Sequence, residues 1–200
     1  MIIDILEQRD EFRIAGCTST MRDTDEVLGY PILGADECLP GLFSSGVRFA
    51  IVAIGDNRVR FEKMRRLSEA GFDLVSAISR DAIVSRHATL GRGVCVMPGA
   101  VINVAVSLGD GAIANTGSTI DHDCVIGECA HVAPGVNLAG CVNIGAGTML
   151  GIGSRVIPGV TIGPWATIGA GAVVIKDLGA NVTAVGVPAR VTSVRTDRGR

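Results

Sequence analysis

Aliphatic residues recur at every sixth position from Ile78 to Val174, without a single insertion. The residue directly after each aliphatic position is often glycine, and the fourth residue after it is usually small. An amphipathic helix repeats about every 3.6 residues and a half-buried strand about every two, so neither explains a period of six. The pattern predicts a β-helix, in which each hexad contributes one short face with an inward aliphatic side chain and one turn.

The composition changes this picture little but narrows the possible functions. Glycine accounts for 27 of the 200 residues and aromatic residues for 4%, which indicates many tight turns around small aliphatic side chains. The 18 Lys and Arg residues nearly balance the 20 Asp and Glu residues. The chain therefore lacks the basic surface that a nucleic acid or an anionic membrane would require.

Two sequence features that the chain lacks indicate its cellular compartment. No apolar run approaches the roughly 18 residues of a membrane span, and the first residues lack the basic segment of a secretory signal. We therefore expect a cytoplasmic protein without membrane insertion. The six cysteines form no Cys-x-x-Cys pair, which favours buried reduced thiols over a metal cluster or a disulfide framework.

Residues 1–77 precede the repeat and are typical of an α/β unit. The apolar run from Val47 to Ile54 predicts a buried parallel strand. A helix is expected from about Arg58 to Ala70, and Phe72 to Ala77 returns as a second strand. Together they form a β-α-β crossover.

The turn Gly55-Asp56-Asn57 follows the first strand of this crossover. Open α/β sheets bind ligands at the carboxyl ends of their strands, and a helix N-terminus offers free N–H groups to phosphate. Gly55, Asp56 and Asn57 are therefore candidate substrate-binding residues. The alternative is purely structural: Gly55 makes the turn, and Asp56 or Asn57 caps the helix.

Several segments resemble the motifs of one enzyme family, the hexapeptide-repeat sugar acetyltransferases. These enzymes N-acetylate nucleotide-linked 4-amino sugars or O-acetylate sialic acid. The similarity covers nearly the whole chain. The segments are Ala53-Ile54-Gly55-Asp56-Asn57-Arg58, the run from Asn115 to Gly127, His131-Val132-Ala133-Pro134-Gly135, and Val185-Gly186-Val187-Pro188-Ala189-Arg190.

The resemblance implies an α/β N-terminal unit followed by a left-handed parallel β-helix of about five to six coils. Three hexads make one triangular coil, so that residues about 18 apart stack in a column. The expected domains are a truncated Rossmann-like nucleotide-sugar-binding domain (1–77), the β-helix acetyltransferase domain (78–179) and a C-terminal extension with a tail (180–200). The family is usually homotrimeric, with its active site between subunits.

The chain departs from the family at its start. The family opens with a strand and a glycine-rich loop that help to hold the nucleotide, whereas this chain begins about where the family's first helix would be. We therefore expect either that this strand lies outside the present reading frame or that nucleotide binding differs.

The phase of the repeat predicts where His122 lies. It is the third residue of its hexad, and the inward positions belong to Ile120 and Cys124, so its side chain points outward and the Cys124 thiol is inert. Gly140 follows one coil later and leaves room for a narrow acyl-pantetheine arm. A histidine can take the proton that an amine loses as it attacks a thioester, and a neighbouring carboxylate fixes its tautomer.

The resemblance assigns roles to several of these residues. It makes His122 the general base of an acetyl-CoA-dependent transfer, with Asp123, rather than Asp121, as its carboxylate partner, and it makes the Gly140 N–H a donor to the thioester oxygen. His131 lies half a coil from His122, so it lines the same site only across a subunit boundary. For acetyl-CoA the resemblance implies contacts with His131, Gly140, Ile152, Gly153, Ala170 and Arg190.

Two alternative functions come from other classes of protein. Zinc hydratases with hexapeptide repeats need three closely spaced imidazoles, whereas the histidines here are His87, His122 and His131. Their spacing argues against a metal enzyme, so we expect no metal cofactor. The other alternative is a non-catalytic β-helix scaffold.

Overall fold

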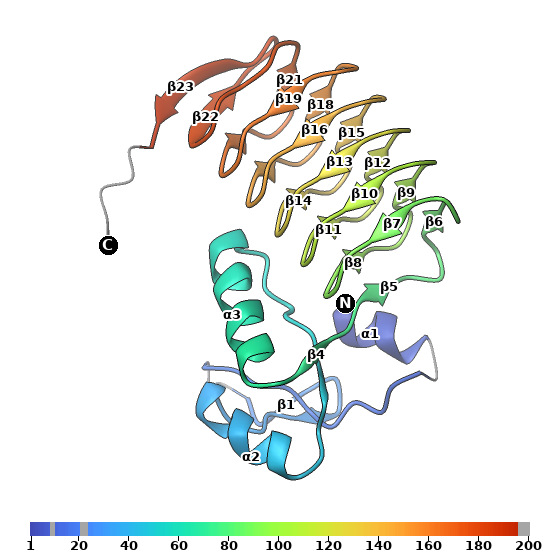
Figure 1. The fold of residues 1–200 in the computed structure, drawn as a ribbon, viewed down its shortest axis with the longest axis vertical. Helices are drawn as coiled ribbons and strands as arrows, with labels where there is room; N and C mark the ends of the chain where they lie inside the picture. The colour runs from blue at the N-terminus through green and yellow to red at the C-terminus, as the bar shows by residue number, and fades with distance from the viewer. Residues whose placement is uncertain (9–10, 21–23, 196–200) are drawn as a thin grey trace.

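The computed structural model describes residues 1–8, 11–20 and 24–195. Figure 1 shows a stack of triangular coils with the N-terminal segment at its first coil and along one side. No helix within the described ranges is both long and apolar enough to cross a membrane.

The repeat forms two-residue strands that begin at every sixth residue, from β5 (Ala77–Ile78) to β21 (Val173–Val174). The strands between them are β6 (Ile83–Val84), β7 (Thr89–Leu90), β8 (Cys95–Val96), β9 (Val101–Ile102), β10 (Ser107–Leu108), β11 (Ile113–Ala114), β12 (Thr119–Ile120), β13 (Val125–Ile126), β14 (His131–Val132), β15 (Asn137–Leu138), β16 (Asn143–Ile144), β17 (Met149–Leu150), β18 (Arg155–Val156), β19 (Thr161–Ile162) and β20 (Thr167–Ile168).

These strands pair in parallel within three sheets, one for each side of the prism. The five-stranded face runs from β7 to β19, the six-stranded face from β6 to β21, and the eight-stranded face from β5 to β23. Thr119 pairs with both Val101 and Asn137, so neighbouring coils are in the predicted register. The second residue of most strands points inward, as Ile120 and Leu150 do at 0% exposure. The predicted solenoid is confirmed.

The three faces meet at three corners of the prism. The His122 corner joins the six-stranded to the five-stranded face, the helix corner joins the five-stranded to the eight-stranded face, and the third corner joins the eight-stranded to the six-stranded face. Past the repeat, β22 (Val182–Val185) and β23 (Arg190–Val194) form an antiparallel hairpin on the eight-stranded face. Residues 196–200 of the expected tail lie outside the described residues.

The N-terminal segment contains short elements around a two-stranded parallel sheet. They are α1 (Ile2–Glu7), β1 (Glu26–Val27), β2 (Tyr30–Pro31), the 3-10 helix η1 (Asp36–Cys38), α2 (Leu39–Ser44), β3 (Phe49–Ala50), α3 (Asn57–Glu69) and β4 (Asp73–Leu74). The order β3, α3, β4 is the predicted crossover, with β3 and β4 paired in parallel.

The prediction of a buried strand over residues 47–54 was wrong in length and burial. β3 spans only two residues and, within the described structure, pairs only with β4. Phe49 is 53% exposed, and its ring packs on Phe12 at a centroid distance of 5.4 Å. An apolar run becomes a long buried strand only if further strands or helices cover both of its faces.

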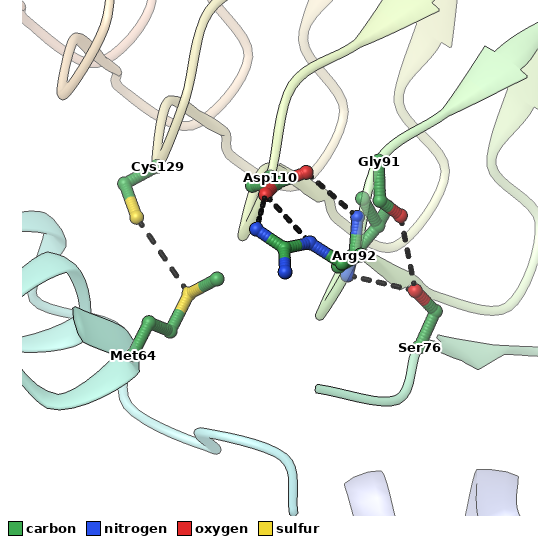
Figure 2. A network of polar contacts seen from close by, with 7 residues as sticks. Met64, Ser76, Gly91, Arg92, Asp110 and Cys129 are labelled. Atoms are coloured by element: carbon green, nitrogen blue, oxygen red, sulfur yellow. Dashed lines mark hydrogen bonds and ion pairs between the residues drawn. The ribbon is translucent and has the colours of Figure 1, made fainter. Parts of the chain in front are cut away.

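Helix α3 packs against the helix corner of the solenoid. The side chain of Met64 fills the space above Gly93 and Gly111, where an added Cβ would lie 3.0 and 2.3 Å from Met64 atoms. Its sulfur lies 3.8 Å from the Cys129 thiol, one coil further on (Figure 2). Figure 2 also shows Arg92 and Asp110 pairing between adjacent coils, at 2.8 Å. Glycines at this corner thus allow a helix to approach the prism closely.

Arg60 of α3 is the polar centre of this interface and is fully buried. Its Nε donates to the Gly111 carbonyl at 2.9 Å, and one terminal nitrogen donates to the Cys129 carbonyl at 2.8 Å. The other terminal nitrogen reaches the carbonyls of Ile54 and Gly55 at 2.8 and 3.1 Å. One guanidinium therefore joins two coils of the solenoid to the turn before α3.

Replacing Arg60 is expected to loosen this interface. Arg60→Ala leaves several buried carbonyls without a donor, which should lower the free energy of unfolding by on the order of 3 kcal/mol. Urea unfolding followed by circular dichroism measures the change. The control Arg155→Ala removes an exposed arginine from β18 and should cost less than about 0.5 kcal/mol. Equal effects of the two substitutions would contradict this role.

Candidate functional site

His122 and Asp123 form a hydrogen-bonded pair at the His122 corner, just after β12. His122 Nδ1 lies 2.8 Å from Asp123 Oδ2, and the two side chains are 51% and 59% exposed. Asp123 has a φ of 59°, and in this turn its carboxylate folds back to the imidazole. The neutral ring therefore carries its proton on Nδ1 and leaves the lone pair of Nε2 free.

Two carboxylates raise the pKa of His122. The largest cause is the hydrogen bond that His122 donates to Asp123, followed by the charge of Asp121. Asp121 has a separate structural task, because its Oδ1 accepts from the His122 backbone N–H at 2.8 Å and from Asn103 Nδ2 at 3.0 Å. Asp123 therefore orients the ring, whereas Asp121 holds the turn.

Gly140 stacks on His122 in the next coil, as the repeat predicts. A Cβ at this position would lie 2.5 Å from Cε1 and 2.6 Å from Nε2 of the imidazole. The N–H groups of Ala139 and Cys141 donate to Val156 and His122 carbonyls, but that of Gly140 has no acceptor within the described part of the chain. The Gly140 backbone thus lies against the imidazole and keeps an N–H that could serve as an oxyanion donor.

The two cysteines near His122 differ in environment. Cys124 is 0% exposed, and burial raises the pKa of its thiol, as suits the predicted inert core residue. Cys141 is exposed, so the prediction of a buried thiol was wrong there. It follows Asp123 by one coil in an outward column, and that spacing is the signal by which the sequence could have revealed it.

His131 lies on the eight-stranded face beneath the N-terminal segment and is 7% exposed. Its Nε2 accepts from Asn115 Nδ2 at 2.9 Å, and its Nδ1 lies 3.4 Å from the Gly55 carbonyl. Burial, followed by the charge of Arg60, lowers its pKa. The neutral ring therefore sits under the Gly55 turn, on a different face from His122 in the same chain.

In the turn Gly55-Asp56-Asn57, the side chains of Asp56 and Asn57 make structural hydrogen bonds. Asp56 caps α3, with its carboxylate accepting from Val59 N–H at 2.9 Å. The Asn57 amide donates to the Gly147 carbonyl at 3.0 Å and accepts from Arg60 at 2.8 Å, and the residue is 8% exposed. Gly55 itself is exposed, and a Cβ added to it would meet nothing within 4 Å. Of the three, Gly55 and the backbone around it remain open to a ligand.

The remaining predicted cofactor residues lie elsewhere on the chain. Ile152 and Gly153 lie between β17 and β18, and Ala170 lies between β20 and β21, so all three are at the third corner. Arg190 begins β23 and is exposed. One chain therefore does not bring these residues to His122 and Gly140, although the third corner and the His122 corner are the two edges of the six-stranded face.

The three histidines do not converge either. His87 accepts from Arg86 at 3.1 Å two coils before His122, and His131 lies on another face. Within the described residues, the only close group of possible metal ligands is His122, Asp123 and Cys141. A three-imidazole zinc site is therefore excluded within one chain.

Comparison with known proteins agrees with this geometry. Residues 141–176 match the family model of the bacterial transferase hexapeptide (six repeats), and residues 1–67 match the PglD N-terminal domain. The chain belongs to the hexapeptide-repeat sugar acetyltransferases, whose repeat winds into a left-handed β-helix. The fold and enzyme class predicted from the sequence are confirmed, and the scaffold alternative is set aside.

Individual relatives are similar over most of their length. PerB from Caulobacter crescentus, solved with CoA and GDP-perosamine, is 48% identical with a TM-score of 0.83, over 84% of this chain and 82% of that chain. The acetyltransferase domain of PglB from Neisseria gonorrhoeae is 36% identical with a TM-score of 0.82, over 86% and 83%. WeeI from Acinetobacter baumannii is 25% identical with a TM-score of 0.85, over 95% and 92%.

Proposed function

We propose that this chain transfers the acetyl group of acetyl-CoA to the amino group of a nucleotide-linked 4-amino sugar, with His122 as general base. The observation that carries the proposal is the 2.8 Å His122–Asp123 pair beside Gly140 at an exposed corner. PerB, solved with CoA and GDP-perosamine, makes a GDP-linked 4-amino sugar the first acceptor to test.

The mechanism follows from the tautomer of His122. Asp123 holds the proton on Nδ1, so Nε2 accepts the proton that the sugar amine loses as it attacks the thioester carbonyl. Asp123 also stabilises the imidazolium that forms. The Gly140 N–H would donate to the developing oxyanion, and the thiol of CoA then leaves. No covalent enzyme intermediate is required.

The site is proposed to form between the chains of a homotrimer. His122 and Gly140 lie at one corner, whereas Gly55 and His131 lie near another, so a second copy must bring the two sets together. His131 and the Gly55 turn would then contact the nucleotide sugar, and His131, Gly140, Ile152, Gly153, Ala170 and Arg190 would contact acetyl-CoA.

The cytoplasm is the proposed location. All six cysteines lie in the described part of the chain, and each is a free thiol, as a reducing compartment maintains.

A thiol-release assay with acetyl-CoA and a panel of nucleotide-linked sugars tests the proposal. We expect release with GDP- or UDP-linked 4-amino sugars, and mass spectrometry should show one N-acetyl group on the product. Release with sialic acid instead would indicate O-acetylation. No release with any acceptor would reject the activity, and a catalytically competent monomer by sedimentation would reject the shared site.

The pH dependence of kcat/KM should report the pKa of His122 in its pair with Asp123. His122 must be neutral to act, and its pKa is raised, so kcat/KM should be lost as the pH falls through that raised pKa. Asp123→Asn removes the main cause of the shift, so the acid limb should move to lower pH while the plateau falls. The amine titrates identically with both enzymes, so the difference isolates His122. An unmoved acid limb would argue against this pairing.

A further inference from the structure

Cys141 brings a third donor atom to the His122 corner. One ligand atom each from His122, Asp123 and Cys141 lie within 4.8 Å of one another, and all three residues are exposed. Asp123 and Cys141 occupy equivalent turn positions one coil apart, with φ values of 59° and 61°. The Cys141 N–H donates to the His122 carbonyl at 2.9 Å, so the backbone holds the three residues together.

The donor set has a definite chemical preference. Zinc takes imidazole nitrogen, thiolate sulfur and carboxylate oxygen at about 2.0 to 2.3 Å in tetrahedral geometry. Neighbouring ligand atoms in such a site lie about 3.5 Å apart. The observed spread of 4.8 Å therefore closes with small side-chain rotations, which exposed side chains at a turn can make.

Asp121 is outside this group of close ligand atoms, and its Oδ1 accepts from the His122 N–H and from Asn103 Nδ2. The cluster thus supplies three ligands from one corner and leaves a fourth position open to water. Such a mixed sulfur, nitrogen and oxygen set selects zinc over magnesium or calcium.

We propose that His122, Asp123 and Cys141 form a binding site for a thiophilic divalent cation such as Zn²⁺, and that the bound ion inhibits acetyl transfer. The inhibition rests on the proposed function of His122, whereas the binding does not. A neutral imidazole has one free lone pair. An ion on either nitrogen therefore leaves no lone pair to accept the proton of the amine, and it also occupies the space beside Gly140.

Cobalt(II) titration of the full-length protein tests the binding without reference to catalysis. The wild type should bind about one equivalent per chain and develop the near-ultraviolet absorption band of a thiolate–cobalt bond, which zinc should then displace. Cys141→Ser should lose the band and weaken binding by at least about tenfold. The matched control Cys38→Ser replaces a half-buried thiol in the N-terminal segment and should keep both.

The turnover assay then tests inhibition. Micromolar zinc should stop the wild type and Cys38→Ser, a chelator should restore both, and Cys141→Ser should continue to turn over at the same zinc concentration. An unchanged melting temperature confirms that Cys141→Ser is folded. The proposal is overturned if the wild type shows no thiolate band, or if Cys141→Ser keeps it. If no acceptor is turned over but the band appears and depends on Cys141, the site stands and the proposed activity fails.

Discussion

His122→Ala should reduce kcat by about 10²- to 10⁴-fold, because general-base catalysis typically contributes that much. The Michaelis constant for acetyl-CoA should change little, since the imidazole acts on the amine rather than on the body of the cofactor. Steady-state thiol release with a nucleotide-linked 4-amino sugar measures both constants.

The control for this substitution is His87→Ala. His87 is exposed in the same corner column as Asp123, two coils earlier, and within the described structure its ring contacts Arg86 rather than a carboxylate. It should retain wild-type turnover. Loss of activity in both variants, or in neither, would contradict the assignment of the base to His122.

Gly140→Ala should lower kcat by about 100-fold without removing any catalytic group, because a displacement of about 1 Å at a reacting atom has an effect of that size. The new methyl group would lie 2.5 Å from the imidazole Cε1, so the ring must turn away from its position. The backbone at Gly140 has no positive φ, and alanine is therefore compatible with the turn itself.

Gly179→Ala provides the matched control, because a Cβ there meets nothing within 4 Å. It should leave both activity and melting temperature unchanged. A fully active Gly140→Ala enzyme would mean that the position of the imidazole is not critical, and it would weaken the general-base proposal as well.

The solenoid was predictable because its period is strict. Leu138 follows Ile120 by one coil, and both are assigned to the interior. Once such aliphatic positions are assigned, the phase of the repeat places every other residue on a face or at a corner. The same phase placed His122 outward and Gly140 beside it. The pairing of His122 with Asp123 came from the resemblance, and the role of the pair remains a prediction.

The N-terminal segment was less predictable because its contacts are not periodic. Nothing local to Arg60 indicates that its guanidinium is buried against carbonyls of Gly111 and Cys129, far along the chain. The short β3 likewise reflects which elements cover it rather than its own composition. Cys141 was missed because a cysteine among small residues reads as core unless its column is followed.

The attachment of α3 also fixes the position of the Gly55 turn along the axis of the solenoid. Arg60 binds the coils at Gly111 and Cys129, and His122 lies between these two residues in the chain. Adjacent coils are separated by about 4.8 Å, so the Gly55 turn is held within roughly one strand spacing of the level of His122. A rotation about an axis parallel to the solenoid changes no heights. In a trimer of that symmetry, each Gly55 turn would therefore lie level with a neighbour's His122 without any sliding of one prism along another.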